Sequence, residues 1–346
     1  MSKRIRFGLT LPFGPIETLL EQAKLVETAG FDTVWFPDHV VSPGNAPHMD
    51  AWCVLSAIAV STKRIMLGPG VTDAVRRHPA FVAHCLLTLD QISRGRAILG
   101  LGAGEPMNTK PFGIEIKQPL QQLREAIHMI RELCTASISE PVTFQGHDYK
   151  LSRAFLGITP YKMSRPPIYL GALGPKTRRL AGELADGWFP YVQTMRNYPK
   201  FVEDIRLGAE SAGRSLDDVD LGANIPIYLV KDGKVPSRTY RRLAIRLLID
   251  GRTLRDYGWN SPTSMTVNEM VVDSGTSQQL ERLADTVPRE IIDELAVIGD
   301  PSEIVERLVQ YTEVGTTHFL IRLLGDNAQR DANTFKEEVI PHFRDA

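Results

Sequence analysis

Four segments of the chain place polar or glycine residues directly after short apolar runs, where they could take part in chemistry. They are WFPDHV with Asp38 and His39, GPGVTDAVRRHP with Gly70, Val71 and Thr72, GLGAGEPMN with Gly104, Glu105 and Asn108, and GALGPKTRR with Ala172, Leu173, Gly174, Pro175, Lys176 and Thr177. Glu105 is the leading candidate, because a carboxylate in a glycine-rich loop has little reason to be there for packing and suits a general acid. The alternative for Glu105 is a capping or solvated loop acid, and His39 could equally be a hydrogen-bonded structural residue.

The loop at residues 174–177, Gly-Pro-Lys-Thr, could hold a phosphate group. Proline suits the first turn of a helix, and the free N–H groups of that turn, aided by Lys176, can bind an anion. The glycines at 100, 102 and 104 do not have the GxGxxG spacing, and no ribose-binding acid follows at the right distance. The sequence therefore predicts a phosphate site, with a plain helix start as the alternative, and carries no dinucleotide fingerprint of the NAD type.

Metal chemistry is not indicated, because no HExxH motif or cysteine pair accompanies these residues. The three cysteines, Cys53, Cys85 and Cys134, cannot make a disulfide framework, and a reducing intracellular compartment fits them best.

The composition narrows the class of partner. The chain has 346 residues, with 40 Lys plus Arg against 41 Asp plus Glu and a formal net charge of -1. A near-neutral chain without a basic block lacks the electrostatic footprint of a nucleic-acid-binding protein, so we expect a small-molecule substrate. No segment approaches ~18 uninterrupted apolar residues, so we expect no membrane span. The start of the chain does not fit a secretory signal. We therefore expect a cytoplasmic protein. We also expect a homodimer or a higher homo-oligomer.

Short apolar strands alternate with amphipathic helices along the chain. The expected strands are 5–11, 33–36, 65–67, 97–101, 168–171, 187–191, 221–229 and 318–323, and the expected helices are 16–28, 51–61, 79–93, 120–133, 177–185, 198–212 and 301–314, with a last helix after Asn333. About eight such units in one chain of this length predict a (β/α)8 TIM barrel, a single domain over 1–346. Two excursions, 135–166 and 231–290, exceed what bare connections need, and we expect such insertions on the C-terminal face of the strands, where barrels build their sites.

The four segments, taken as a set, are similar to the bacterial-luciferase-like superfamily of barrel oxidoreductases. The matching motifs are PDH after the second strand, GPGVT after the third, SRGRAILGLGAGEP around the fourth, PPIYLGALGPKTRRLAGELADGW at the fifth and sixth, and IGDPSEIVERLVQYTEVGTTHFLI near the end. Within the superfamily the chain resembles the branch that uses the deazaflavin coenzyme F420, with methylenetetrahydromethanopterin reductase, the deazaflavin-type glucose-6-phosphate dehydrogenase and phthiodiolone ketoreductase. The excursion at 231–290 is poorly matched.

The resemblance implies roles for the segments. Asp38 and His39 would lie beside the deazaflavin ring, and Gly70 and Val71, followed by Thr72, match the place of a non-prolyl cis peptide that bulges against it. Gly104, Glu105 and Asn108 match the loop whose acid donates a proton during hydride transfer, and residues 172–177 match the loop that holds the cofactor phosphate. The catalytic residues would thus be Glu105 and His39.

Departures from the family pattern bear on the substrate. Sugar-phosphate dehydrogenases of this branch have a basic residue soon after the sixth strand, where this chain has Gln193 and Thr194, so a phosphosugar is disfavoured. The methanopterin reductases usually show GPGD where this chain has GAGE, and the PHMDAW and VTDAVRRHP segments favour a ketoreductase. The leading hypothesis is hydride transfer between coenzyme F420 and a C=O or C=N carbon. The alternatives are a luciferase-like monooxygenase that uses FMN and a non-catalytic barrel that binds a deazaflavin or flavin.

Overall fold

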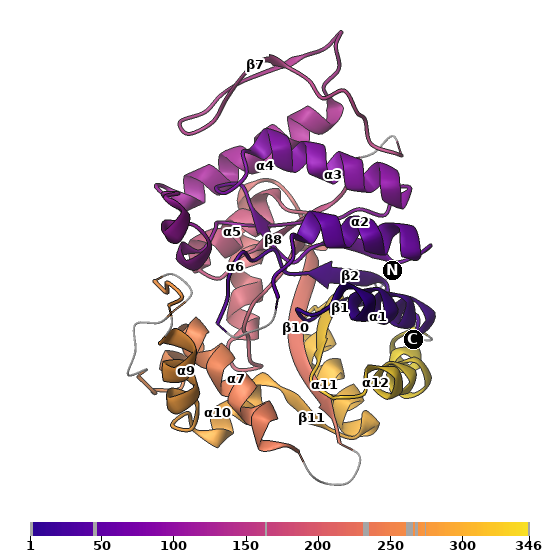
Figure 1. The fold of residues 1–346 in the computed structure, drawn as a ribbon, viewed down its shortest axis with the longest axis vertical. Helices are drawn as coiled ribbons and strands as arrows, with labels where there is room; N and C mark the ends of the chain where they lie inside the picture. Colours follow the sequence, from indigo (N-terminus) through magenta and orange to yellow (C-terminus); the bar gives the residue numbers. More distant parts are fainter. Residues whose placement is uncertain are drawn as a thin grey trace.

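The computed structural model describes residues 3–43, 47–162, 165–230, 235–260, 266, 269–273 and 275–344. Within these residues, strands and helices alternate (Figure 1). The strands are β1 (Arg6–Thr10), β2 (Thr33–Phe36), β3 (Met66–Pro69), β4 (Thr72–Asp73), β5 (Leu99–Gly102), β6 (Val142–Gln145), β7 (Lys150–Ala154), β8 (Ile168–Gly171), β9 (Gly187–Trp188), β10 (Asp220–Leu229), β11 (Val297–Gly299) and β12 (His318–Leu323).

Twelve α-helices lie within the same described residues. They are α1 (Ile16–Thr28), α2 (Ala51–Ser61), α3 (Pro79–Ser93), α4 (Pro119–Thr135), α5 (Pro175–Leu184), α6 (Tyr198–Ser211), α7 (Ser237–Asp250), α8 (Arg252–Asp256), α9 (Thr276–Ala284), α10 (Arg289–Leu295), α11 (Pro301–Glu313) and α12 (Ala328–Thr334). Several starts have a clear local cause. Asp50, for example, caps α2 by accepting the amides of Trp52 and Cys53 at 2.9 and 3.3 Å.

The main sheet is parallel and closes on itself. Its strand order is β3-β2-β1-β12-β10-β9-β8-β5-β4, with β11 added to the outer end of β10. At the two ends of this path, β3 pairs with β2 and reaches the chain before β5 through a bridge between Leu67 and Ala97, while β4 pairs with β5. β3 and β4 are therefore two pieces of one strand, interrupted at Gly70 and Val71. The described residues thus give eight strand positions, and the predicted (β/α)8 barrel is confirmed.

Aromatic and aliphatic side chains fill the barrel interior. Trp35, Ile98, Tyr169, Phe189 and Leu320 form one buried cluster contributed by strands from all round the barrel. A much larger apolar cluster lies between the strands and the surrounding helices. Parallel strands covered in this way are buried on both faces, which is why their sequences read as short continuous apolar runs.

A buried polar network closes the N-terminal end of the barrel, away from the strand ends that carry the sequence motifs. His318 is 0% exposed and lies 2.9 Å from the Thr33 hydroxyl and 3.2 Å from the Tyr169 hydroxyl. Asp220 accepts hydrogen bonds from Tyr169, at 2.8 Å, and from Arg6. Burial, with the Arg6 charge adding to it, lowers the pKa of His318 well below its usual value, so this imidazole is neutral in the fold.

The two excursions occupy opposite ends of the molecule (Figure 1). The first leaves α4 and enters β8, and it folds into an antiparallel hairpin of β6 and β7 whose Tyr149 hydroxyl donates to the Ala74 carbonyl beyond β4. The second follows β10 directly and forms α7, α8, α9 and α10. Its apolar core includes Met107 and Val192 from the loops after β5 and β9, so these helices cover the C-terminal ends of the strands.

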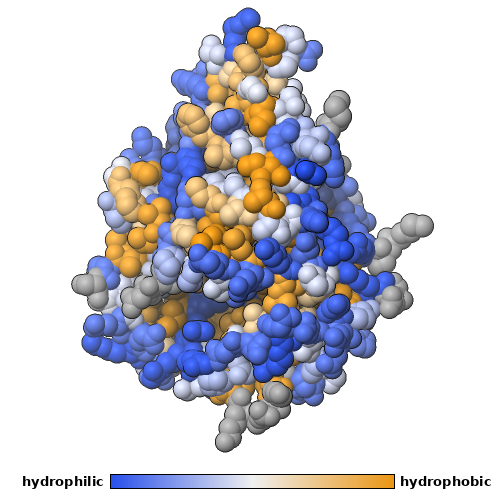
Figure 2. All heavy atoms as spheres, turned by 45° about the vertical axis from the view of Figure 1, so that its right-hand side comes forward, coloured by the Kyte–Doolittle hydropathy of each residue, from blue (hydrophilic) through white to orange (hydrophobic). Residues whose placement is uncertain are grey.

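The surface carries a few large exposed hydrophobic side chains. Val60, Phe81 and Ile92 belong to α2 and α3. In Figure 2, hydrophobic atoms gather over the upper half of the molecule, and hydrophilic atoms dominate the lower half. Among the described residues no helix is long and apolar enough to cross a membrane, and the three cysteines are free.

Candidate active site

Three predicted residues meet at the C-terminal ends of β2 and β5. The Nδ1 atom of His39 lies 3.3 Å from the Oε2 atom of Glu105, and the side chains of both keep partial access to solvent, 23% and 32% respectively. Asn108, in the short turn after Glu105, lies between them and is 2% exposed. The interrupted strand β3/β4, which contains Gly70 and Val71, lies between β2 and β5 in the sheet. The cluster therefore reaches across the end of this strand.

Asn108 holds the cluster together with both ends of its amide. Its Oδ1 accepts the backbone N–H groups of Val40 and Val41 at 2.7 and 3.0 Å. The amide orientation is therefore fixed, and Nδ2 faces His39 Nδ1 at 3.0 Å and Glu105 Oε2 at 3.2 Å. Asn108 positions the two candidate proton carriers relative to each other.

This arrangement selects a tautomer of His39. Because Nδ2 of Asn108 can only donate, Nδ1 of the neutral imidazole must accept, and the ring proton then lies on Nε2. When the imidazole is protonated on both nitrogens, Nδ1–H has Glu105 Oε2 within reach as its acceptor. His39 Nδ1 and Glu105 Oε2 thus lie 3.3 Å apart and share the Asn108 amide as a neighbour.

Asp38, the neighbour of His39, has its carboxylate turned into the protein. It is 4% exposed, and its Oδ2 accepts from the Thr72 hydroxyl at 2.6 Å, from Arg76 at 3.1 Å and from Arg77 at 2.6 Å. These bonds tie the loop after β2 to the segment after β4. The structure thus gives Asp38 and Thr72 a positioning role, and contact of either with a cofactor stays a prediction.

The peptide bond between Gly70 and Val71 is cis, as the resemblance implied. The Val71 side chain is directed at the glycines of the neighbouring strands, where a Cβ on Gly100 or Gly171 would approach it to 3.0 Å. Gly104, directly before Glu105, has φ +85°, a conformation that L side chains rarely adopt. The backbone on both sides of the cluster is therefore shaped by residues without side chains.

The predicted phosphate loop is the start of α5. Pro175 is the first helical residue, and the Thr177 hydroxyl accepts from Gly174 N at 3.1 Å and lies 2.9 Å from Gly174 O. The amides of the first turn have no partner within the helix and are available to an anion. Ala172 is buried, and Lys176 is exposed.

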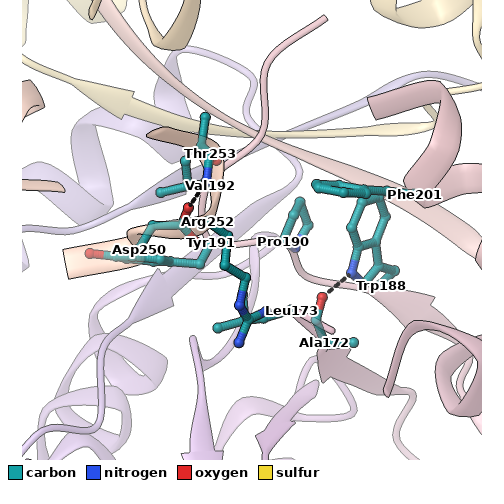
Figure 3. A pocket seen from close by; sticks show the side chains of 10 residues that line it. All are labelled: Ala172, Leu173, Trp188, Pro190, Tyr191, Val192, Phe201, Asp250, Arg252 and Thr253. Carbon is teal, nitrogen blue, oxygen red and sulfur yellow. Dashed lines mark hydrogen bonds between the residues drawn. The ribbon is translucent and has the colours of Figure 1, made fainter. Parts of the chain in front are cut away.

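Arg252 also reaches this loop, from the second excursion. Its Nη1 atom is buried without a hydrogen-bond partner, and it lies 3.9 Å from the position that a Cβ on Gly174 would take. Figure 3 shows the guanidinium directed toward Leu173, in a small cavity that Trp188 and Tyr191 also line. Sequence reasoning missed Arg252, because it lies in a poorly matched segment with no motif of its own.

A second arginine, Arg178, holds the phosphate loop from within α5. Arg178 donates to the Leu173 carbonyl and pairs with Asp204 through Nη2 at 2.7 Å, and its guanidinium lies over the Phe201 ring. Unlike Arg252, it has its carboxylate partner. Its role is therefore structural, and it leaves Arg252 as the spare cation of the loop.

In the segment after β9, positions 193 and 194 are uncharged, as the sequence shows, and the cation of this segment, Arg196, lies over the Tyr257 ring, 4.7 Å from its centroid. Gln193 is 1% exposed and donates to the Asn224 carbonyl at 2.8 Å, and Thr194 is 0% exposed. Within the described residues no group of His, Cys, Asp and Glu has the geometry of a metal site.

An eight-position parallel barrel with its polar groups gathered at the strand ends is the architecture of a barrel enzyme. The chain belongs to the luciferase-like monooxygenase family, whose model matches residues 4–318. An F420-dependent glucose-6-phosphate dehydrogenase of Nakamurella multipartita is 32% identical over 98% of this chain and 97% of its own. A 5,10-methylenetetrahydromethanopterin reductase of Archaeoglobus fulgidus is 30% identical over 93% and 94%. The structure of an F420-dependent secondary alcohol dehydrogenase in complex with an F420-acetone adduct matches with a TM-score of 0.85 and 26% identity, over 99% of this chain and 100% of that one.

Proposed function

We propose that this chain is an oxidoreductase that transfers a hydride between coenzyme F420 and a C=O or C=N carbon of a small molecule. The observation that carries the proposal is the cluster of His39, Asn108 and Glu105 at the ends of β2 and β5, on both sides of the cis peptide. Relatives over the full length of the chain are named as F420-dependent enzymes, and one of them is a secondary alcohol dehydrogenase. A ketone or an alcohol is the substrate class that we favour.

The loop at the start of α5 fits the phosphate of this cofactor. Its first-turn amides and the orphaned Nη1 of Arg252 are donors without acceptors, which is the donor set that a phosphate requires. Lys176 would add an exposed point charge. The ring would lie against Gly70 and Val71, near His39 and Gly104, and when bound it supplies the carbon that gives or takes the hydride.

The residues of the chain then have to supply one proton to the substrate oxygen, or to accept it in the reverse direction. Reduction of a carbonyl carbon places negative charge on its oxygen, and a positioned acid that shares a proton with that oxygen accelerates the reaction. Glu105 is the proposed acid and His39 its partner, and the Asn108 amide keeps both in place through His39 Nδ1 and Glu105 Oε2. In the reverse direction the same pair accepts the proton of an alcohol.

The test is a titration of the purified protein with oxidised coenzyme F420 and with FMN, followed by a screen of ketones and pterins for oxidation of the reduced deazaflavin. We expect micromolar binding of F420, turnover of at least one carbonyl compound and no hydride uptake from NADPH. Oxygen-dependent turnover with FMN alone would establish the monooxygenase instead. Binding without turnover that is also insensitive to changes at Glu105 and His39 would establish the non-catalytic barrel. A cytoplasmic location and a homo-oligomeric state stay predictions, to be checked by fractionation and sedimentation.

A further inference from the structure

A second cavity opens on the opposite side of the barrel mouth from the cis peptide. It measures about 240 Å³ and lies between α7 and the ends of β10 and β12. Its charged lining is basic, with Arg242 and Arg246 from α7 and Arg322 from β12. The rest of the wall is Tyr191, Pro226 and aliphatic side chains of α7 and of Leu324. The four-residue spacing of Arg242 and Arg246 places both on the same face of their helix.

Two of these arginines are buried in part and have unused donors. The Nε atoms of Arg246 and Arg322 are closed to solvent and have no hydrogen-bond partner. Arg246 does donate to the Tyr191 carbonyl, and its guanidinium lies over the Tyr191 ring, 4.3 Å from the centroid. An N–H group left unpaired inside a protein costs free energy, so neither guanidinium is fully satisfied within the described residues.

The charge of the pair is not balanced by a contacting carboxylate in the described part of the chain. Burial, reinforced by repulsion from Arg246, lowers the pKa of Arg322 to about 9, so it remains charged at neutral pH. Burial also lowers the pKa of Arg246. The charge of Asp250 raises the pKa of Arg246. The Asp250 carboxylate does not pair with Arg246, however, and accepts the Thr253 amide at 2.7 Å.

Tyr191 lines this cavity and also the small cavity beside the phosphate loop that Arg252 lines. Burial raises the pKa of Tyr191, the charges of Arg246 and Arg322 oppose this rise, and the charge of Glu105 adds to it. Tyr191 is therefore within electrostatic range of both the basic cavity and the proposed acid. A molecule whose carbonyl lies beside Glu105 could extend into the cavity.

We propose that this cavity binds an anionic group, a carboxylate or a phosphate, of the substrate that is reduced at the His39 and Glu105 cluster. The guanidinium groups of Arg242, Arg246 and Arg322 line the cavity, and their charge and forked donors match the paired oxygens of either anion. The inference rests on the proposed function for its substrate. It assigns to α7 and β12 a basic site that the segment with Gln193 and Thr194 does not offer.

The test is calorimetric and needs no turnover. Levulinate and its neutral methyl ester are titrated into the Arg252→Gln protein, in which the spare cation of the other loop is absent. The same titrations are made with Arg246→Gln, Arg322→Gln or Arg241→Gln added. Arg241 is the matched control, because it lies on the same helix but pairs on the surface with Asp285 at 2.8 Å. We expect levulinate to bind more tightly than its ester, Arg246→Gln and Arg322→Gln to weaken it by about 10-fold or more, and Arg241→Gln to leave it unchanged.

Two further measurements separate the possible failures. Thermal unfolding should show Arg322→Gln to be as stable as the parent or more so, since it removes an uncompensated charge, whereas Arg246→Gln also loses its contacts with Tyr191. Arg322→Lys should keep part of the levulinate affinity. Equal binding of levulinate and its ester, or equal loss in the control, overturns the anion site. A tenfold loss of coenzyme F420 affinity in the cavity variants would assign the anion to the cofactor and overturn the substrate assignment. If F420 does not bind at all while levulinate binding depends on Arg246 and Arg322, the proposed function fails and the anion site stands.

Discussion

Replacement of Arg252 by glutamine tests where the phosphate of the cofactor lies. The guanidinium of Arg252 has a buried Nη1 without a partner beside Gly174, whereas Lys176 in the same loop is exposed to solvent. Arg252→Gln removes the charge and keeps much of the side-chain volume. We expect it to weaken binding of coenzyme F420 far more than Lys176→Gln does.

The magnitude follows from burial. A hydrogen bond to a charged group contributes about 1.5 to 3 kcal/mol, so loss of the Arg252 contact should raise the dissociation constant about 10- to 150-fold. An exposed ion pair contributes about 0.2 to 1 kcal/mol, so Lys176→Gln should raise it by no more than about 5-fold. The rate of the saturated enzyme should change little in either variant, because neither residue lies at the reacting atoms.

The stability of the protein without cofactor should respond much less than the affinity. Burial lowers the pKa of Arg178, and the Arg252 charge adds to this lowering, which means that the two arginines repel each other. Removing Arg252 relieves this repulsion but also removes the attraction between its charge and Asp250, so the melting temperature should not fall by much. Weaker binding combined with little loss of stability is the signature of a residue kept for a ligand.

The assay is a fluorescence titration of F420 with differential scanning calorimetry on the same samples. Arg255→Gln is the control, since Arg255 lies on the same short helix and is exposed. A lower melting temperature with an unchanged dissociation constant would show that Arg252 is structural. A larger loss of affinity for Lys176→Gln than for Arg252→Gln would refute the reasoning from burial.

Three further predictions concern the catalytic cluster and the closed end of the barrel. Glu105→Gln should lower kcat about 10²- to 10⁴-fold with little change in F420 affinity, because it keeps the shape but cannot release a proton; stopped-flow oxidation of the reduced cofactor measures this. Asn108→Leu should lower kcat by up to about 10²-fold and also shift the pH-rate profile, because His39 loses the donor that fixes its tautomer. The free energy of unfolding should fall by about 1.4 kcal/mol per pH unit as the pH drops below ~6.5, because His318 is neutral when folded and takes up a proton when unfolded; urea unfolding at several pH values measures this slope.

Each of these expectations has a contrary result. A large rate loss and a lost pH limb in His39→Asn, with a small effect in Glu105→Gln, would make His39 the acid. An Asn108→Leu variant that is slower by the same factor at every pH would mean that only the loop is loosened. His318→Gln should remove the slope below pH ~6.5, and the exposed His84→Gln should not; an unchanged slope in His318→Gln would place the titrating group elsewhere.

The barrel was accessible from sequence because its signals are local. Strands 33–36, 168–171 and 318–323 and helices 16–28, 51–61 and 79–93 have the predicted bounds, since each strand is buried on both faces and bounded by turn residues. Other elements differ for physical reasons. β9 ends at Trp188 instead of residue 191, because Tyr191 already belongs to the covering loop, and α5 starts at Pro175 rather than residue 177, because proline can occupy the first turn.

The candidate site also has residues that local sequence signals predict and residues that only tertiary contacts place. The loops with His39, Glu105 and Asn108 follow buried strands, so their convergence was predictable, whereas the inward orientation of Asp38 depends on Arg76 and Arg77 arriving from another strand. The elements of the second excursion were not predicted individually. Its helices are short and charged, and what places them is their shared apolar core with the strand-end loops, which no local periodicity records.

The unpaired arginines show why the net charge of the chain does not exclude an anionic ligand. A formal net charge of -1 argues against a polyanionic partner but says nothing about single anions, because those are recognised by local geometry. Many arginines in the described residues form an ion pair with a carboxylate, for example Arg178 with Asp204. Arg246, Arg252 and Arg322 form no ion pair there, and each has a buried N–H group without an acceptor. All three lie where the second excursion covers the barrel mouth, two in one cavity and one at the phosphate loop. A part-buried cation without a contacting carboxylate or a full set of acceptors is costly to a fold, so we explain their common location by two anionic groups, one on each side of Tyr191, that the protein binds during its reaction.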